Sequence, residues 1–197
     1  MTLLKTIWQR DGELVVAFGP DGEVTLAELR RGSLQLARAM ARHAGAGQPG
    51  ARWALCFDDS LLFTQALLAC ALGGYQAILP GHQRLAGLQA LQAQFDGLLT
   101  DGELPGAALA VPQLRLPLLV ADDEREADGA ALPPERLDLT LFSSGSTGEP
   151  KAIPKAWPQL EAELRVQMAL WGERLVDTRV LASVSSGSTA WRISVSM

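Results

Sequence analysis

The sequence predicts an α/β fold in which a largely parallel sheet carries helices on its faces. Short apolar runs alternate with longer helical patterns between residues 51 and 100, in the order strand, helix, strand, helix, strand. Helical crossovers are the usual connection between parallel strands, so this order favours a parallel sheet. A chain of 197 residues with a hydrophobic fraction of 48% can also bury a substantial core.

The first predicted elements are a hairpin and an amphipathic helix. Residues 14–18 (LVVAF) lie between two turn signals that contain Asp-Gly, which predicts a strand that returns at Val24. Thr25 and Glu28 have the spacing of a capping box, so a helix should begin there and end near His43. Its apolar face is expected to carry Leu26, Leu29, Leu34, Ala37 and Ala41.

The following segments alternate between strands and helices. We predict strands at residues 53–57, 75–79 and 98–100, and helices at residues 61–72 and 85–94. Asp59 and Ser60 are good N-cap residues for the helix at 61–72, and Gly73-Gly74 should end it. This helix is apolar nearly all round, which predicts burial on more than one side.

The second half of the chain is predicted to contain further strands at residues 114–120, 137–142 and 179–184. A helix should run from residue 157 or 158 to about residue 171, while the charged run at 121–128 reads as a solvated loop. Pro117 suits an edge or an end of its strand. We expect one subdomain at residues 1–184 and an atypical Ser-rich tail at 185–197, which lacks a strong core pattern.

The residues with the clearest chemistry lie just after the strand predicted at 137–142. The sequence SSGSTGEPK occupies residues 143–151. Glycines let backbone N–H groups approach an anion, and hydroxyls and a lysine add donors and positive charge, so this segment predicts a phosphate-holding loop. Its spacing excludes a Walker loop, in which Lys directly follows Gly, and the dinucleotide pattern GxGxxG is absent.

Residues 143–151 resemble the phosphate loop of the AMP-forming acyl/aryl-acid adenylating enzymes. This superfamily includes acyl-CoA synthetases, luciferases and the adenylation domains of peptide synthetases. Its pattern continues with Gly after the lysine, where this chain has Ala152. Residues 24–29 and 67–80 also resemble segments of the superfamily, so the resemblance covers about residues 22–184 and implies a partial version of the large N-terminal domain.

The resemblance also implies a function and a set of site residues. The reaction joins a fatty or aryl carboxylic acid to AMP from ATP and then transfers the acyl group to the thiol of CoA or an acyl carrier protein. Lys151 would be the catalytic residue that neutralises charge on the leaving pyrophosphate, and Mg²⁺ would bind phosphate oxygens and Thr147. The β- and γ-phosphates of ATP would be held by Ser143, Ser144, Gly145, Ser146, Thr147, Gly148 and Lys151.

Several downstream motifs of the superfamily have no counterpart in the sequence. These are the Tyr-Gly-x-Thr-Glu segment, the ribose-binding Asp, the hinge and the second catalytic lysine. We therefore interpret the chain as a truncated N-terminal part that is inactive alone and exposes apolar surface for self-association. Two alternatives are a non-catalytic nucleotide- or phosphate-binding module, that is a pseudo-enzyme, and a purely structural α/β domain.

Composition narrows the possible partners and locations. A net charge of −5 argues against a nucleic-acid-binding surface. No apolar run reaches the roughly 20 residues of a membrane span, and the N-terminus does not resemble a signal peptide, so a cytoplasmic location is expected. Cys56 and Cys70 lie in apolar segments and should be buried and unreactive. His43 and His82 lie at a predicted helix end and a turn, with no catalytic role expected.

Overall fold

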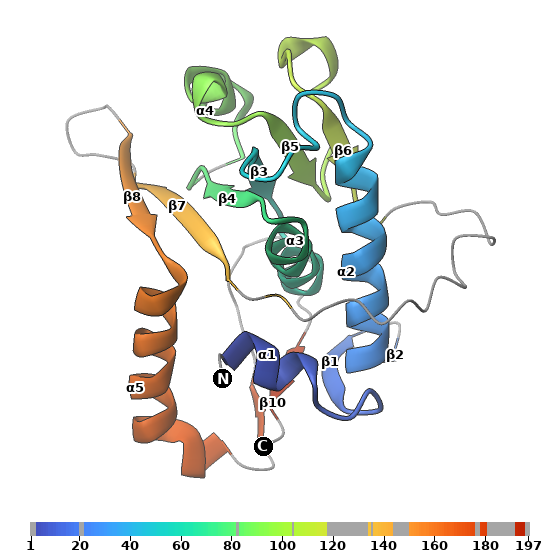
Figure 1. Ribbon diagram of the computed structural model, residues 1–197, viewed down its shortest axis with the longest axis vertical. Coiled ribbons are helices and arrows are strands. Elements are labelled where there is room, and N and C mark those ends of the chain that lie inside the picture. The colour runs from blue at the N-terminus through green and yellow to red at the C-terminus, as the bar shows by residue number, and fades with distance from the viewer. Residues whose placement is uncertain are drawn as a thin grey trace.

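Two β-sheets organise the chain. The computed structural model describes residues 3–19, 22–81, 83–103, 105–117, 134, 136–143, 150–175, 178–180 and 192–195. Within these ranges the strands form a six-stranded sheet in the order β6-β5-β3-β4-β7-β8 and a four-stranded sheet in the order β2-β1-β10-β9 (Figure 1).

The larger sheet is parallel except at one edge. Its strands are β3 (Arg52–Cys56), β4 (Gln76–Leu79), β5 (Gly97–Thr100), β6 (Gln113–Arg115), β7 (Asp138–Ser143) and β8 (Lys151–Lys155). All neighbouring pairs run parallel except β7 and β8, which are antiparallel. Helix α3 (Ser60–Gly73) connects β3 to β4, and helix α4 (Leu85–Ala90) lies between β4 and β5. This arrangement confirms the predicted α/β class.

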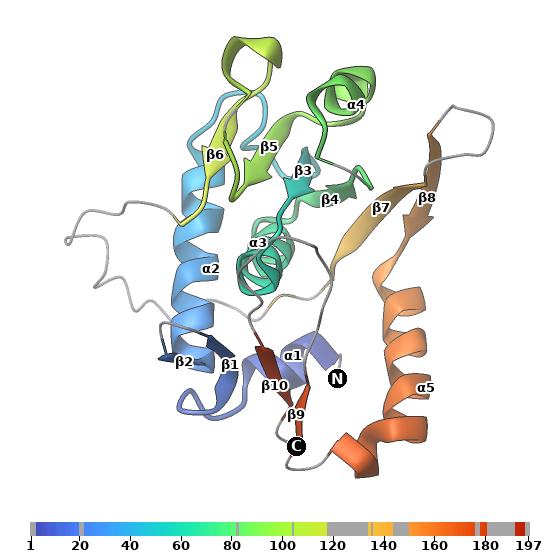
Figure 2. The same ribbon diagram turned by 180° about the vertical axis from the view of Figure 1, so that it is seen from behind.

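Each face of the larger sheet has its own hydrophobic core. Trp53, Leu55 and Ala77 pack in one cluster with residues of α3 and of α2 (Leu26–Ala41). Ala54, Cys56 and Ile78 belong to a second cluster, together with residues from α4 and the turn that follows it. This alternation follows from the two-residue period of a strand, and it creates a helix–sheet–helix arrangement. Figures 1 and 2 both show α2 and α3 side by side.

Helix α2 begins at the predicted capping box. The Thr25 hydroxyl accepts a hydrogen bond from the Glu28 N–H at 3.3 Å, and the Glu28 carboxylate accepts one from the Thr25 N–H at 2.7 Å. The predicted apolar face was partly wrong, because Leu34 is only half-buried and Ala41 is exposed. The buried residues of α2 are Leu26, Leu29, Ser33, Leu36, Ala39 and Met40.

Ser33 explains why the apolar pattern misplaces this face. Its side chain is fully buried although serine is polar. The hydroxyl donates to the carbonyl of Leu29 at 2.7 Å, so the polar group is satisfied within the helix. The buried row therefore keeps helical spacing through Leu29, Ser33, Leu36 and Met40, whereas the predicted face followed Leu34, Ala37 and Ala41.

Helix α3 begins and ends as the sequence predicts. The Asp59 carboxylate accepts hydrogen bonds from the N–H groups of Leu61 and Leu62 at 2.8 and 2.9 Å. Gly74 follows the last turn in the left-handed conformation, with φ of 68°, and its N–H donates to the Cys70 carbonyl. Such a C-cap is easily adopted by glycine because it has no side chain.

Two predicted elements are shorter in the structure. The helix expected at 85–94 ends at Ala90, and a separate 3₁₀ turn follows at Gln92–Gln94. The strand expected at 114–120 is β6 (Gln113–Arg115), which ends two residues before Pro117. Residues 118–133 lie outside the described residues, and they include the charged run at 121–128.

The smaller sheet joins the two ends of the chain. Strands β1 (Val15–Gly19) and β2 (Gly22–Thr25) form the predicted hairpin. Strand β10 (Arg192–Val195) lies between β1 and β9 (Thr178–Val180), so part of the C-terminal tail belongs to this sheet. The short helix α1 (Leu3–Trp8), which the sequence pattern did not predict, buries Leu4 and Trp8.

Strand β8 and helix α5 form the other edge of the molecule. The strand was not predicted, because Pro154 has no N–H to donate. Pro154 is tolerated within β8 because β8 is the outermost strand of the larger sheet. Helix α5 (Trp157–Leu175) begins at the predicted residue and extends beyond the predicted end.

Helix α5 exposes large apolar side chains on more than one of its faces. Five large apolar residues there are between 41% and 66% exposed, namely Leu164, Val166, Met168, Leu170 and Trp171. The views from front and back show α5 standing beside the β7–β8 hairpin, separate from α2 and α3 (Figures 1 and 2). The expectation of exposed apolar surface is confirmed, whereas self-association stays a prediction.

None of the helices in the described ranges is long and apolar enough to cross a membrane.

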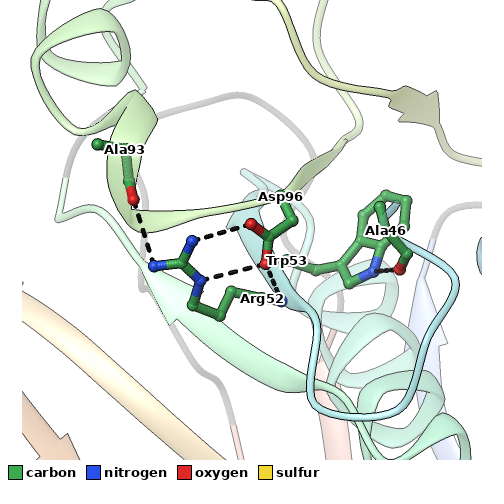
Figure 3. Close-up of polar contacts among 5 residues, drawn as sticks. All are labelled: Ala46, Arg52, Trp53, Ala93 and Asp96. Carbon is green, nitrogen blue, oxygen red and sulfur yellow. Dashed lines mark hydrogen bonds and ion pairs between the residues drawn. The ribbon is translucent and has the colours of Figure 1, made fainter. Parts of the chain in front are cut away.

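An ion pair ties β3 to the start of β5 (Figure 3). The Arg52 guanidinium donates to both carboxylate oxygens of Asp96, at 2.8 and 3.1 Å, and to the Ala93 carbonyl at 3.2 Å. The backbone N–H of Arg52 donates to the same carboxylate at 2.9 Å. Beside it, the Trp53 indole N–H donates to the Ala46 carbonyl at 2.9 Å and holds the loop that precedes β3.

Candidate functional site

The β7–β8 hairpin brings together the two ends of the predicted phosphate loop. In its register Ser143 pairs with Lys151, Phe142 with Ala152 and Leu141 with Ile153. Cross-strand partners lie on the same face of a sheet with Cβ atoms about 5 Å apart, so Ser143 and Lys151 are neighbours at the end of the hairpin. The predicted residues Ser144, Gly145, Ser146, Thr147 and Gly148 lie outside the described residues.

Strand β7 holds Ser143 in place because it is anchored on both sides. It lies between β4 and β8, and Leu139, Thr140 and Phe142 are each at least 91% buried. The Gln76 side chain of β4 also donates to the Thr140 hydroxyl at 3.4 Å. Ser143 itself is exposed, so the strand runs from the core to the surface at the point where the loop begins.

The two lysines of β8 have different surroundings. Lys155 forms an ion pair with Glu163 of α5. Lys151 is exposed, and no carboxylate in the described part of the chain pairs with it. Successive side chains of a strand alternate between faces, so Lys151 and Lys155 lie on the same face of β8. Among the described residues, Lys155 is therefore the paired lysine of β8, and Lys151 forms no ion pair.

The carboxyl end of β4 lies beside the carboxyl end of β7. These strands are parallel neighbours, with Leu79 opposite Leu141. After Pro80 the backbone passes so close to β7 that a Cβ atom on Gly81 would lie 2.5 Å from the Phe142 carbonyl oxygen. Ligands of open parallel sheets bind where strands end in this way, outside their carboxyl ends.

A polar cluster that the sequence did not predict lies at the ends of β3 and β5. The Asp101 carboxylate accepts hydrogen bonds from the backbone N–H groups of Asp58 and Asp59, at 2.9 and 2.8 Å. The Gln83 side chain donates to the Asp58 carboxylate at 3.1 Å. Only the position of each Asp directly after an apolar run could have suggested this cluster. Across the described ranges no group of three or more His, Cys, Asp or Glu side chains could hold a metal ion.

Both cysteines are free, buried and unsuited to nucleophilic chemistry. Burial raises the pKa of the Cys70 thiol to about 12. Burial, with a smaller contribution from the Asp101 carboxylate, raises the pKa of the Cys56 thiol to about 12 as well. A thiolate is the reactive form of cysteine, so both side chains are inert near neutral pH.

The histidines show no arrangement for catalysis within the described residues. The His43 ring packs edge-on against Trp53, with ring centroids 6.2 Å apart. His82 lies outside the described residues. The contact of His43 fits a structural role at the end of α2.

Sequence comparison identifies fungal peptide synthetases as relatives. Nonribosomal peptide synthetase aneB of Aspergillus aculeatus is 34% identical over 142 residues, which cover 66% of this chain and 13% of the relative. Nonribosomal peptide synthetase flvI of Aspergillus flavus is 32% identical over 161 residues, covering 76% of this chain and 14% of that protein. The chain thus spans about a seventh of these relatives. No protein-family model matches the chain.

Structural comparison shows a shared fold. The o-succinylbenzoate coenzyme A synthetase MenE of Bacillus subtilis, solved with ATP and magnesium, matches with a TM-score of 0.64 and 21% identity. That match covers 86% of this chain and 47% of the synthetase. VinN, solved with L-aspartate, matches with a TM-score of 0.66 and 18% identity over 86% of this chain and 52% of VinN. The larger adenylate-forming enzymes thus share the fold of this chain in their N-terminal domain, as predicted.

Proposed function

We propose that this chain, as a member of the superfamily of AMP-forming adenylating enzymes that its relatives and its fold indicate, holds the phosphates of ATP in a carboxylic acid–thiol ligase. The observation that carries the proposal is the pairing of Ser143 with Lys151 where the hairpin opens into residues 144–149. This pairing supports a loop whose two ends converge on one anionic ligand.

The proposed reaction has two steps. A carboxylate oxygen of the acid attacks the α-phosphorus of ATP, and the bond to the pyrophosphate oxygen breaks. A thiol sulfur of CoA or of a carrier protein then attacks the acyl carbon, releasing AMP and a proton. Negative charge grows on the leaving pyrophosphate in the first step, so prearranged donors around it lower the barrier.

Lys151 is the proposed catalytic residue for that first step. Lys151 is exposed, is the cross-strand partner of Ser143 and forms no ion pair with a carboxylate in the described part of the chain, which supports a role in neutralising a phosphate oxygen. Ser143, Ser144, Gly145, Ser146, Thr147 and Gly148 are proposed to donate hydrogen bonds to the β- and γ-phosphates. Bound Mg²⁺ would supply further charge neutralisation, with Thr147 as its protein ligand.

The names of the relatives bear on which acid is activated and which thiol accepts the acyl group. Both fungal relatives are named as peptide synthetases, and VinN was solved with L-aspartate. MenE is named as a synthetase that uses coenzyme A. Amino acids therefore join fatty and aryl acids as candidate substrates, and the higher sequence identity to peptide synthetases favours a carrier-protein thiol over CoA. We place this activity in the cytoplasm.

A second candidate is a phosphate-binding module without chemistry. The sequence contains no counterpart of the ribose-binding and second-lysine motifs of the superfamily. The groups assigned to the site would then bind pyrophosphate or ATP, and this chain alone would be inactive. Acid-dependent exchange of radioactive pyrophosphate into ATP distinguishes the two functions, because only adenylation is reversed by pyrophosphate.

The binding test compares two lysines of the same strand. Isothermal titration of the full chain with Mg²⁺-pyrophosphate is expected to show saturable binding that Lys151→Ala weakens about tenfold to a hundredfold, as for loss of one charged hydrogen bond. Lys155→Ala is the matched control, because its side chain is paired with Glu163 and should leave binding unchanged. Equal binding by Lys151→Ala and the wild type would contradict the assigned role of Lys151.

A further inference from the structure

We propose that Gly81 is a positioning residue for the β7–β8 hairpin and so for Ser143 and Lys151. The inference rests on the proposed function, because it assigns a role to Gly81 through the phosphate-holding loop. Gly81 belongs to the turn after β4, and it is distant in sequence from the loop motif.

The backbone conformation of Gly81 is the first observation. Its φ angle is +79°, in the left-handed region that side-chain-bearing residues rarely adopt. The second observation is the space beside it. A Cβ atom there would lie 2.5 Å from the carbonyl oxygen of Phe142 and 3.7 Å from its carbonyl carbon. Real Cβ atoms essentially never lie closer than 3.0 Å to such a neighbour, so the backbone at Gly81 or the backbone at Phe142 would have to move.

The Phe142 backbone is the part of β7 that would move. Its carbonyl belongs to the main chain, so no side-chain rotation can relieve the clash. β7 pairs with β4 along residues 138–141, so Phe142 lies just beyond the last residue that β4 holds, and only β8 pairs with the strand at that point. Phe142 is followed directly by Ser143, and its cross-strand partner Ala152 is followed in register by Lys151. A side chain at position 81 is therefore expected to displace the end of the hairpin, with Ser143 and Lys151, from its place beside β4.

A second glycine supplies a matched control. Gly45, in the loop after α2, has a φ angle of +81°, almost the same as that of Gly81. A Cβ atom on Gly45 would meet nothing within 4 Å. Gly45→Ala therefore introduces the same backbone strain as Gly81→Ala without the collision. Any difference between the two variants reports the contact with Phe142.

The first measurement is hydrogen–deuterium exchange of the full chain without ligand. Gly81→Ala is expected to increase exchange in peptides that cover β7 and β8, and to leave β3 and β5 protected as in the wild type. Gly45→Ala should leave β7 and β8 unchanged. Loss of protection throughout the sheet in Gly81→Ala would overturn the inference, because Gly81 would then be a general folding residue. Unchanged exchange in β7 and β8 would overturn it as well.

The second measurement is titration with Mg²⁺-pyrophosphate. Gly81→Ala is expected to weaken binding about tenfold or more, whereas Gly45→Ala binds like the wild type. Wild-type affinity in Gly81→Ala would overturn the positioning role while leaving the proposed function intact. Absence of binding by the wild type would instead contradict the proposed function, and the exchange experiment would still decide whether Gly81 positions the hairpin.

Discussion

Removal of the Asp96 carboxylate should destabilise the fold by about 2 kcal/mol at neutral pH. Asp96→Ala removes the acceptor for three donors of Arg52, at distances of 2.8 to 3.1 Å. Hydrogen bonds to charged groups are worth about 1.5–3 kcal/mol, whereas exposed ion pairs contribute about 0–1 kcal/mol. The two side chains are 35% and 34% exposed, so water partly replaces the lost contacts, and the expected loss lies in the lower half of the range for charged hydrogen bonds.

The effect should depend on pH with a defined sign. The hydrogen bond from the Arg52 side chain holds the pKa of Asp96 below its ordinary value. A carboxyl group with a depressed folded-state pKa contributes its full stability above the unfolded-state pKa of about 3.9. That contribution is lost as the pH falls through the folded-state pKa. The difference in free energy of unfolding between the wild type and Asp96→Ala should therefore shrink in acid.

Urea denaturation at pH 7 and in a series down to pH 3 measures the free energy of unfolding of both proteins, and thermal unfolding at pH 7 measures their melting temperatures. At neutral pH the melting temperature should fall by about 4–8 °C, as expected for 2 kcal/mol in a chain of this size. Arg165→Ala is the control, because its pair with Glu161 is on the surface of α5, with the Arg165 side chain 60% exposed, and its loss should leave the stability close to that of the wild type. A loss below about 0.5 kcal/mol for Asp96→Ala, or one that does not change with pH, would refute the role of this ion pair.

Two further predictions concern the helix surface and the thiols. Leu170→Glu should reduce self-association in light scattering without lowering the melting temperature, because Leu170 is 66% exposed on α5; undiminished association would exclude this surface as its cause. Cys56 and Cys70 should react with a thiol reagent at pH 8 only upon unfolding in urea, because burial raises both pKa values to about 12; rapid labelling of the native protein would contradict their burial.

Local signals predicted much of the fold. The capping box of Thr25 and Glu28, the Asp59 cap and the left-handed Gly74 each depend on residues within one helical turn, and each is found in the structure. The alternation of strand and helix likewise predicted the parallel order, because a crossover helix constrains strand direction. The buried row of α2 was less predictable, since Ser33 satisfies its hydroxyl inside the helix.

Elements stabilised by distant partners were not predictable. Strand β8 contains Pro154 and forms by pairing with β7 at the edge of the sheet. Strand β10 pairs with β1, which lies at the opposite end of the sequence. The residues near either strand do not predict its partner, because strand pairing depends on which distant strand the fold places next to it.

The sequence by itself determined the class of the fold, the family resemblance and the residues proposed to hold phosphate, because these depend on local spacing. The tertiary structure decided which of those residues can act together. It placed Lys151 opposite Ser143, paired Lys155 with Glu163 and brought the backbone of Gly81 against Phe142. The last two contacts reach beyond the motif, to α5 and to the turn after β4, so they depend on how the chain folds rather than on local spacing.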